Sequence, residues 1–272
     1  MITNLSWEVE ERPLFSNNQR IEGYKALYRS DNNELLQVAK STYTPVTNER
    51  FLEVITRLSE ITGFPIEMYD EVNKGKKVIA FLKCTDPITV NGYKFKDWLM
   101  VGNSHDGSTG FFIGNSNMMI RCENRFTKQF QSLKVLHTAN NDFRINQLAN
   151  SFDDYTKQRQ RFYNRFSEYI DFEIIEGDKS KIVNSLVEVS PLEIEQPETI
   201  STRKQNIITD IHRSIERETS ELGNNLFGLF NGVTHYTSHV RRQKEAVFCN
   251  AFGTSADFNN RALTFCETLI NR

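Results

Sequence analysis

The sequence lacks the cysteine pairs that mark a structural zinc site. Its four cysteines, Cys84, Cys122, Cys249 and Cys266, lie far apart, and no C-x-x-C pair occurs. Structural zinc sites usually show close ligand pairs, whereas isolated cysteines in apolar contexts behave as small buried hydrophobes. We therefore expect four reduced cysteines, no metal and no cofactor.

Long apolar runs are also missing. No stretch approaches the ~20 residues that span a bilayer, and the first residues, MITNLSWEVEER, lack the basic start and apolar stretch of a secretory signal. With 38% hydrophobic and 25% charged residues, the composition suits a globular protein with a buried core. We expect a cytoplasmic protein without a membrane partner.

Catalytic signatures are absent as well. The sequence has no P-loop, dinucleotide-binding fingerprint, nucleophile elbow or kinase motif. His235 and His239 have the i, i+4 spacing of a metal pair, but neither a third ligand nor the glutamate of a zincin motif accompanies them. These absences favour a binding protein over an enzyme and leave the enzymatic alternative open.

Alternation of apolar and polar residues dominates the first half of the chain and predicts strands. A helix is expected from the N-cap residue Asn48, with apolar residues at helical spacing, to the terminating sequence Gly63-Phe64-Pro65. The predicted strands lie within residues 23–46 and at 66–71, 77–85, 88–90, 93–101, 111–121 and 133–137.

Helical spacing dominates the second half. Apolar residues three and four apart from Ile145 to Tyr169 predict one long amphipathic helix, whose stripe serves the core or an oligomer seam. Further helices are expected at 202–221, 225–242 and 257–271. We predict an α+β protein with a β-rich part at 1–139 and a mainly helical part at 140–272. The two would form one continuous domain, with an acidic connector near 188–200 that carries two prolines.

The sequence GNSHDGSTG, residues 102–110, stands between two of the predicted strands. Asp-Gly is a hairpin signal because glycine reaches positive φ without steric cost. The turn alone gives no reason for the other polar residues around its apex. The loop is therefore either a decorated turn or a functional site, and its candidate residues are Asn103, Ser104, His105, Asp106 and Ser108.

Charge is unevenly distributed, although the net charge is only −2. Residues 119–170 contain nine basic and five acidic residues, whereas residues 171–221 contain twelve acidic and six basic residues. This asymmetry indicates either a binding face balanced by an acidic segment or segregation of ordinary solvated surface.

The basic region supplies the candidate nucleic-acid contacts. Arg121 and Arg125 lie where a predicted strand ends and a helix could begin, a place suited to phosphate. The segment YTKQRQRFYNRF, residues 155–166, interleaves cations with aromatic rings, as a single-stranded nucleic-acid groove requires. The alternative is a solvated face beside a buried stripe. The candidates are Arg121, Arg125, Lys128, Lys157, Arg159, Arg161 and Arg165.

Several segments together resemble the family called domain of unknown function 932, a group of phage- and plasmid-like proteins. They are Trp7, YKALYRSDN (24–32), VAKSTYTPVTN (38–48), NSHDGS (103–108), IRCEN (120–124), LHT (136–138) and NLFGLFNGVTHYTSH (225–239). The chain has Phe227-Gly228 where the family has Trp-Gly, and His235 where the family is acidic, which weakens the metal pair.

The resemblance implies an accessory protein of phages or plasmids in a host bacterial cell, close to DNA processing. A β-rich half followed by helices is also loosely compatible with phage single-strand annealing proteins. Our leading hypothesis is a homo-oligomer that binds single-stranded DNA and possesses annealing activity. The alternatives are an interaction protein that acts on a host defence or replication factor, and a metal-dependent nucleic-acid enzyme that uses His105 and Asp106.

Overall fold

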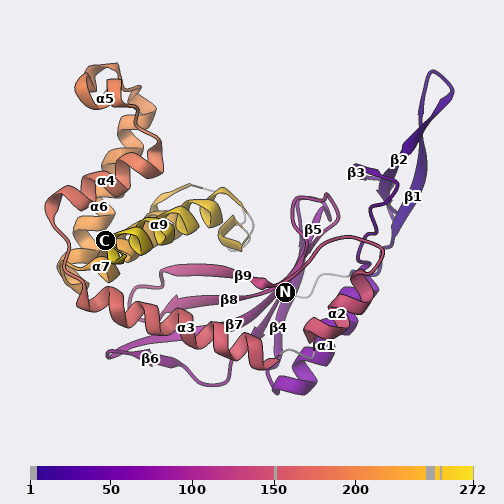
Figure 1. Ribbon diagram of the computed structural model, residues 1–272, viewed down its shortest axis with the longest axis horizontal. Helices are drawn as coiled ribbons and strands as arrows, with labels where there is room; N and C mark the ends of the chain where they lie inside the picture. The colour runs from indigo at the N-terminus through magenta and orange to yellow at the C-terminus, as the bar shows by residue number, and fades with distance from the viewer. Residues whose placement is uncertain (1–4, 150–151, 243–248, 252, 272) are drawn as a thin grey trace. The chain divides into compact units, whose positions relative to one another are not determined.

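A computed structural model describes residues 5–149, 152–242, 249–251 and 253–271 (Figure 1). The chain has an α+β fold with antiparallel sheets first and helices afterwards, as the sequence predicts. It divides into two compact units. Unit 1 comprises Met1–Asp86, Asp97–Ser116 and Gln129–Arg159, and unit 2 comprises Pro87–Lys96, Asn117–Lys128 and Gln160–Arg272. Each unit therefore draws on residues from both sides of position 140.

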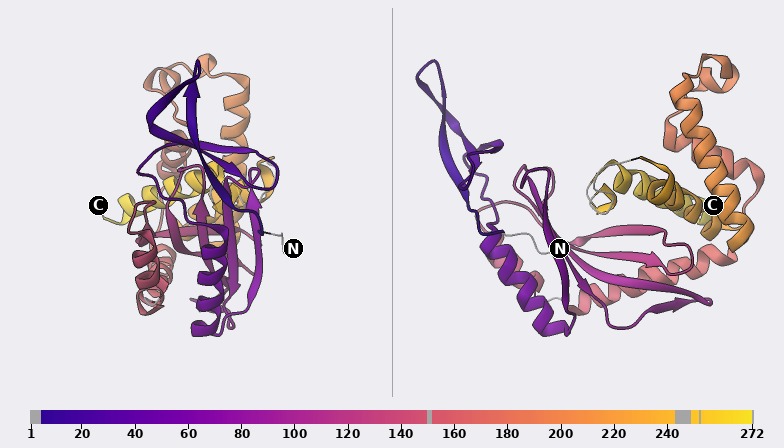
Figure 2. Two further views of the ribbon diagram at one scale, coloured as in Figure 1. Left: turned by 90° about the vertical axis from the view of Figure 1, so that its right-hand side faces the viewer. Right: turned by 180° about the vertical axis from the view of Figure 1, so that it is seen from behind.

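A three-stranded antiparallel sheet opens unit 1, in the order β1 (Val9–Ser16), β2 (Gln19–Arg29) and β3 (Leu35–Lys40). Strands β1 and β2 form a long hairpin (Figure 2). Asn17 and Asn18 form its turn, and both have positive φ angles, a conformation that asparagine tolerates better than most residues. Strand β1 was not predicted, since Pro13 interrupts its pattern. An edge strand tolerates such a proline because the backbone N–H groups on its outer side form no hydrogen bonds with a neighbouring strand.

A second sheet contains six strands in the order β4-β5-β7-β8-β9, with β6 paired to β7. Their bounds are β4 Ile66–Val72, β5 Lys77–Lys83, β6 Ile88–Val90, β7 Tyr93–Ser104, β8 Phe111–Met119 and β9 Arg125–Val135. Strands β7, β8 and β9 contribute residues to both units. The predicted strand at 133–137 is thus only the end of a longer strand.

Helix α1 (Asn48–Thr62) begins and ends close to the predicted positions, but its N-cap is Thr47, whose hydroxyl accepts from the Arg50 backbone N–H. Asn48 lies in the first turn and is 1% exposed. The helix packs Phe51, Ile55 and Leu58 against alternate residues of β5, β7 and β8. This arrangement forms the core of unit 1 and leaves the Asn48 side chain for a contact elsewhere.

The long amphipathic helix predicted from Ile145 is described as two helices, α2 (Asn141–Ala149) and α3 (Phe152–Asp171). Residues 150 and 151 between them lie outside the described residues. The aromatic stripe of α3 is buried, as the spacing indicated, through Tyr155, Phe162, Phe166 and Tyr169. The stripe therefore belongs to the cores of the units.

Helices make up most of unit 2. They are α4 (Glu176–Val187), α5 (Pro191–Glu195), the 3₁₀ turn η1 (Pro197–Thr199), α6 (Thr202–Leu222), α7 (Leu226–His235), the π-helix η2 (Tyr236–Val240) and α9 (Thr254–Ile270). The expected connector near 188–200 contains α5 and η1, and α4 was missed. Helix α7 packs closely on α6 at Gly232, where an added Cβ would collide with the backbone of Ile215.

In the described structure, no helix begins near Arg121, where the sequence pattern allowed one. Strand β8 ends at Met119, and a tight turn leads directly into β9 at Arg125. The Glu123 backbone N–H bonds to Met119 O at 2.8 Å and its φ is 55°. Arg121 therefore lies within this turn and Arg125 begins β9, so no helix start supplies free N–H groups there.

Among the described residues, no helix combines the length and apolar character needed to cross a membrane.

Candidate functional site

His105 follows β7 and its side chain is completely buried. Its Nε2 atom lies 3.0 Å from Asn48 Oδ1, and its backbone N–H donates to Lys76 O at 2.7 Å. The histidine of the polar loop thus points into unit 1. It joins the end of β7 to the first turn of α1.

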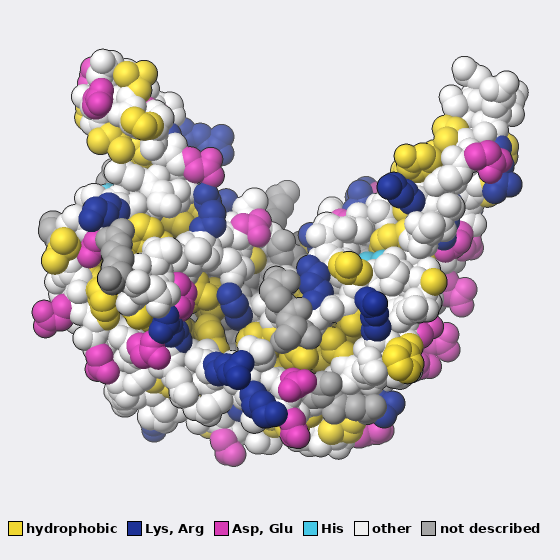
Figure 3. Space-filling model, viewed as in Figure 1, with side chains coloured by type: hydrophobic (Ala, Val, Ile, Leu, Met, Phe, Trp, Pro, Cys, Tyr) yellow, Lys and Arg dark blue, Asp and Glu magenta, His cyan; other side chains and the backbone are white. Residues whose placement is uncertain are grey.

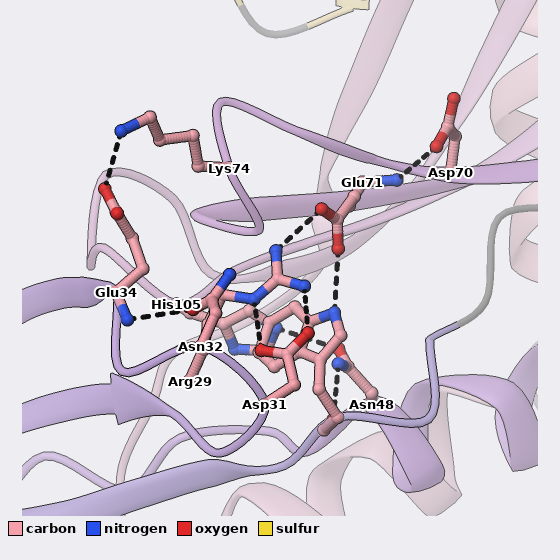
Figure 4. A network of polar contacts seen from close by, with 10 residues as sticks. Arg29, Asp31, Asn32, Glu34, Asn48, Asp70, Glu71, Lys74 and His105 are labelled. Carbon is pink, nitrogen blue, oxygen red and sulfur yellow. Dashed lines mark hydrogen bonds and ion pairs between the residues drawn. The ribbon is translucent and has the colours of Figure 1, made fainter.

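A chain of polar contacts extends from this pair to the N-terminal sheet (Figure 4). Asn48 Nδ2 donates to Trp7 O at 2.9 Å, and the Trp7 ring meets the His105 ring edge-on at 5.3 Å. Trp7 Nε1 donates to Glu71 at 2.7 Å. The Arg29 guanidinium lies 4.2 Å from the Trp7 ring centre and pairs with Glu71 at 2.6 Å and Asp31 at 2.8 Å.

Contacts from the neighbouring loops complete the cluster. Tyr43 stacks on His137 with ring centres 4.9 Å apart and donates its hydroxyl to Ser104 O at 3.2 Å. Asn103 Nδ2 donates to Val46 O at 3.1 Å. Each of the five family-like segments of unit 1 contributes a side chain: Trp7, Arg29, Tyr43, Asn48, His105 and His137. We call these six residues the His105 cluster.

The outer part of the loop forms ordinary turn contacts. Asp106 accepts the Ser108 backbone N–H at 3.0 Å, and the Ser104 hydroxyl donates to Thr109 O at 2.6 Å. His105 bonds inward to Asn48, whereas Asp106 serves the exposed tip. The two neighbours therefore do not act as a dyad in the described structure.

The electrostatics of the His105 cluster keep its histidines neutral. Burial, assisted by His137 and Arg29 and opposed by Asp106, lowers the pKa of His105 to about 3. Burial also lowers the pKa of His137. Within residues 5–149, 152–242, 249–251 and 253–271, no group of three His, Cys, Asp or Glu side chains could hold a metal ion. The cluster is built to anchor loops to one another.

Two of the seven predicted nucleic-acid contacts form close ion pairs within the protein, and a third is half-buried. Arg159 pairs with Asp97, whose side chain is 0% exposed. Arg165 pairs with Glu168 and Glu267. Lys128 is half-buried, and burial lowers its pKa although Glu267 opposes the shift. These positions contribute less free positive charge than the sequence pattern indicated.

The remaining predicted contacts differ in exposure. Lys157 and Arg161 are exposed one turn apart on α3. The Arg121 side chain is 57% exposed and lies 3.9 Å from Glu221. Arg125 is half-buried, and its backbone N–H donates to the Ser238 hydroxyl at 3.1 Å. Lys157, Arg161 and Arg121 remain available to a ligand.

Unit 2 brings its two family-like segments, IRCEN and the one ending in THYTSH, together beside α6. His239 Nε2 lies 3.1 Å from Cys122 O, and Asn124 Nδ2 donates to Asn231 O at 3.3 Å. His235 contacts Ser214 through Nδ1 and Arg217 through Nε2, at 3.2 and 3.1 Å. Burial, helped by His239 and Arg217, lowers the pKa of His235 to about 4.

Glu218 on α6 lies close to Arg217, Cys122 and Asn124. Its side chain is 0% exposed, and neither carboxyl oxygen has a well-formed hydrogen bond among the described residues. Burial raises its pKa, and Glu221 adds to the effect. A neutral carboxyl group can occupy such a place, whereas an unpaired carboxylate would be costly.

A pocket of about 760 Å³ in unit 2 is the feature that the sequence reasoning missed. Its wall contains four arginines from three segments: Arg203 on α6, Arg241 and Arg242 after η2, and Arg261 on α9. We call it the arginine pocket. The adjacent pair Arg241-Arg242 was a visible signal. The other two arginines join it only through folding.

Comparison with known families gives one match. A family model described as domain of unknown function (DUF932) matches residues 35–262. No curated protein matches the chain, and no solved structure matches it.

Proposed function

Because the chain belongs to the domain of unknown function 932 family, a family named without an activity, we propose a function from its own residues. The protein binds single-stranded nucleic acid, and the arginine pocket of unit 2 is its phosphate-binding site. The observation that carries this proposal is the gathering of four arginines around one pocket.

The charges of the pocket support phosphate binding. Arginine keeps its charge at any physiological pH and matches phosphate oxygens with two parallel hydrogen bonds. Arg203 and Arg242 are exposed, and neither has a carboxylate within ion-pair distance in the part of the chain that the structure describes. These two side chains can reach a ligand without breaking an internal ion pair.

Exposed cations outside the pocket can add to the attraction for a strand. Lys157 and Arg161 lie on α3, and Lys94 and Lys96 are exposed on β7. Cations that neutralise several phosphates supply most of the affinity for single-stranded nucleic acid and make it salt-dependent. The aromatic stripe of α3, which is buried, takes no part in stacking.

The wider expectations from the sequence belong to the same proposal. The protein would act in phage or plasmid DNA metabolism in the bacterial cytoplasm, as a homo-oligomer that promotes annealing. Light scattering measures the oligomer. A quenching assay with two complementary labelled oligonucleotides measures annealing, and an unchanged rate at saturating protein would contradict that activity.

Fluorescence anisotropy with a labelled single-stranded DNA at low salt tests the proposed binding. The double variant Arg203→Glu, Arg242→Glu should bind at least about tenfold more weakly, because charge-assisted hydrogen bonds are lost. Its salt dependence should also fall by about 0.7 in logarithmic slope for each phosphate contact removed. No binding by the unmodified protein at low salt would end the proposal.

The double variant Lys157→Glu, Arg161→Glu is the matched control, since it changes the net charge equally on another exposed surface. Its affinity should fall less than that of the pocket variant. If the helix variant loses binding and the pocket variant retains it, the protein still binds nucleic acid, but through α3.

A second candidate function is supported by the acidic segment. Helix α5 has no buried residue, and Leu192 and Ile194 are 57% and 56% exposed. Apolar side chains gather on this helix (Figure 3). Exposed apolar patches rimmed by charge are typical of protein interaction sites.

This candidate predicts a stoichiometric protein partner that survives nuclease treatment of a host lysate. The double variant Leu192→Ser, Ile194→Ser should lose that partner and keep its affinity for DNA. The opposite result would remove α5 from consideration.

A further inference from the structure

We infer that the arginine pocket selects a phosphomonoester or polyphosphate group carried on a nucleoside, rather than an internal phosphodiester of a strand. This inference rests on the proposed function and names the chemistry of its site. The group can belong to the phosphorylated 5′ end of a single strand or to a free nucleotide.

The concentration of arginines in one place favours a highly charged group. A phosphomonoester carries a charge of about −1.5 to −2 at neutral pH and offers three acceptor oxygens. An internal phosphodiester carries a single charge and two free oxygens, and its neighbours lie further along the strand. Four guanidinium groups on one pocket wall match the first arrangement better than the second.

Two of the arginines are held in place before any ligand arrives. Arg241 donates to the Thr254 hydroxyl at 2.9 Å, and its guanidinium lies 5.8 Å from the centre of the Phe258 ring. Arg261 donates to Leu186 O at 2.7 Å and lies 5.6 Å from the same ring. Side chains fixed in this way lose little conformational freedom on binding, which favours affinity.

The acidic residues of the pocket leave positive charge in excess. Glu188 pairs with Arg261 at 2.7 Å, and Asp210 lies 3.7 Å from Arg213, which is not part of the pocket wall. Asp257, in the first turn of α9, is the third carboxylate of the wall, so the four arginines exceed the carboxylates by one. Arg203, Arg241 and Arg242 are therefore the arginines left for an anion.

The pocket wall also contains apolar side chains, which argues for a nucleoside beside the phosphate. Its volume of about 760 Å³ lies within the usual range of ligand sites and exceeds what a phosphate group alone would fill. The apolar lining consists of Leu186, Val187, Ile207, Tyr236, Val240 and Phe258. A base and sugar can pack on these side chains while the phosphates contact the arginines.

The test compares one oligonucleotide sequence with a 5′-phosphate and with a 5′-hydroxyl, each labelled at the 3′ end. Wild-type protein should bind the phosphorylated strand about tenfold more tightly, as expected for one added set of charge-assisted hydrogen bonds. The double variant Arg203→Gln, Arg242→Gln should bind both strands with nearly equal affinity. These residues are exposed, so the variant should fold normally, which circular dichroism checks.

Competition with a nucleoside triphosphate distinguishes the two sources of the group. If the two strands bind equally but the triphosphate displaces them from wild type and not from the variant, the ligand is a free nucleotide. Equal binding of both strands with no displacement would overturn this inference and leave nucleic-acid binding intact. Failure of both strands to bind would overturn the inference together with the proposed function.

Discussion

His105 Nε2 and Asn48 Oδ1 lie 3.0 Å apart in the interior of unit 1. The contact joins the loop after β7 to the first turn of α1, and Asn48 continues it to the Trp7 backbone. Its position explains why a polar loop carries a histidine that solvent does not reach. His105 contacts Asn48, 57 residues before it in the sequence, and Trp7, 98 residues before it, and so holds these segments together.

The first prediction concerns the two parts of the polar loop. His105→Ala should lower the free energy of unfolding by about 2–4 kcal/mol, because it opens a cavity and leaves the buried Asn48 Oδ1 without its hydrogen-bond partner. Ser108→Ala at the exposed tip should change it by less than about 0.5 kcal/mol. Urea denaturation measures both. Equal, small effects would mean that His105 is not an anchor.

The second prediction concerns Gly75, which has a φ of 84° beside the Trp7 and Arg29 side chains. A Cβ there would lie 2.7 Å from both Trp7 Cζ2 and Arg29 Nη1. Gly75→Ala should therefore add steric displacement of Trp7 to the cost of about 1–2 kcal/mol for the left-handed backbone. Near-ultraviolet circular dichroism should report the displaced indole.

Gly92→Ala is the matched control, because Gly92 has a φ of 87° and nothing within 4 Å of its added Cβ. It should show the backbone cost alone, without a change in the tryptophan signal. If Gly75→Ala is no more destabilised than this control, the Trp7 and Arg29 side chains can move aside at little cost in free energy. Their contact would then not hold the N-terminal sheet in place.

The third prediction separates an internal ion pair from an exposed cation on α3. Arg159→Gln leaves Asp97 buried without its charged partner and should cost about 3–5 kcal/mol. Lys157→Gln, two residues away and exposed, should cost almost nothing. Thermal unfolding at neutral pH measures the difference. A destabilised protein that still binds DNA normally once folded would confirm that Arg159 serves the structure alone.

The fourth prediction concerns Glu218 and its pH dependence. Its pKa is raised in the folded protein, so the folded state holds a proton more tightly than the unfolded state. The stability it contributes is complete at low pH and is lost as pH rises through the raised pKa. Glu218→Gln keeps the shape and removes this loss.

With increasing pH, the free energy of unfolding of the Gln variant should therefore rise relative to that of the wild type. The rise is at most about 1.4 kcal/mol per pH unit between the unfolded-state and folded-state pKa values of Glu218. Urea unfolding from pH 5 to pH 8 measures the difference between the two proteins. A difference that stays constant with pH would mean that Glu218 is ionised in the folded state.

The fold followed from local signals where these agreed with tertiary packing. The spacing of Phe51, Ile55 and Leu58 predicts α1, and the packing against the sheet uses the same three residues. Strand β1 and helix α4 were missed because neither has a clear apolar period. Strand β1 gains its stability from pairing with β2, and α4 from Ile182, Val183 and Leu186 in the core of unit 2.

The candidate site was harder to predict, because side-chain partners come from distant segments. The sequence shows Arg159 and Arg165 among aromatic residues, but Asp97 and Glu267, which pair with them, lie 62 and 102 residues away. Neutralisation by such partners leaves no trace in a local charge pattern. The same distance hides the arginine pocket, whose wall spans residues from 186 to 261.

The π-helix η2 has a consequence for communication within unit 2. Its closing hydrogen bond joins the Arg241 N–H to Tyr236 O at 2.8 Å, five residues back, so the turn holds one residue more than an α-helical turn. His239 contacts Cys122 O from this turn, while Tyr236 and Val240 line the arginine pocket. Arg241, which closes the widened turn, and His239 within it therefore belong to one short segment, so a ligand in the arginine pocket would contact the same turn that holds the Cys122 carbonyl.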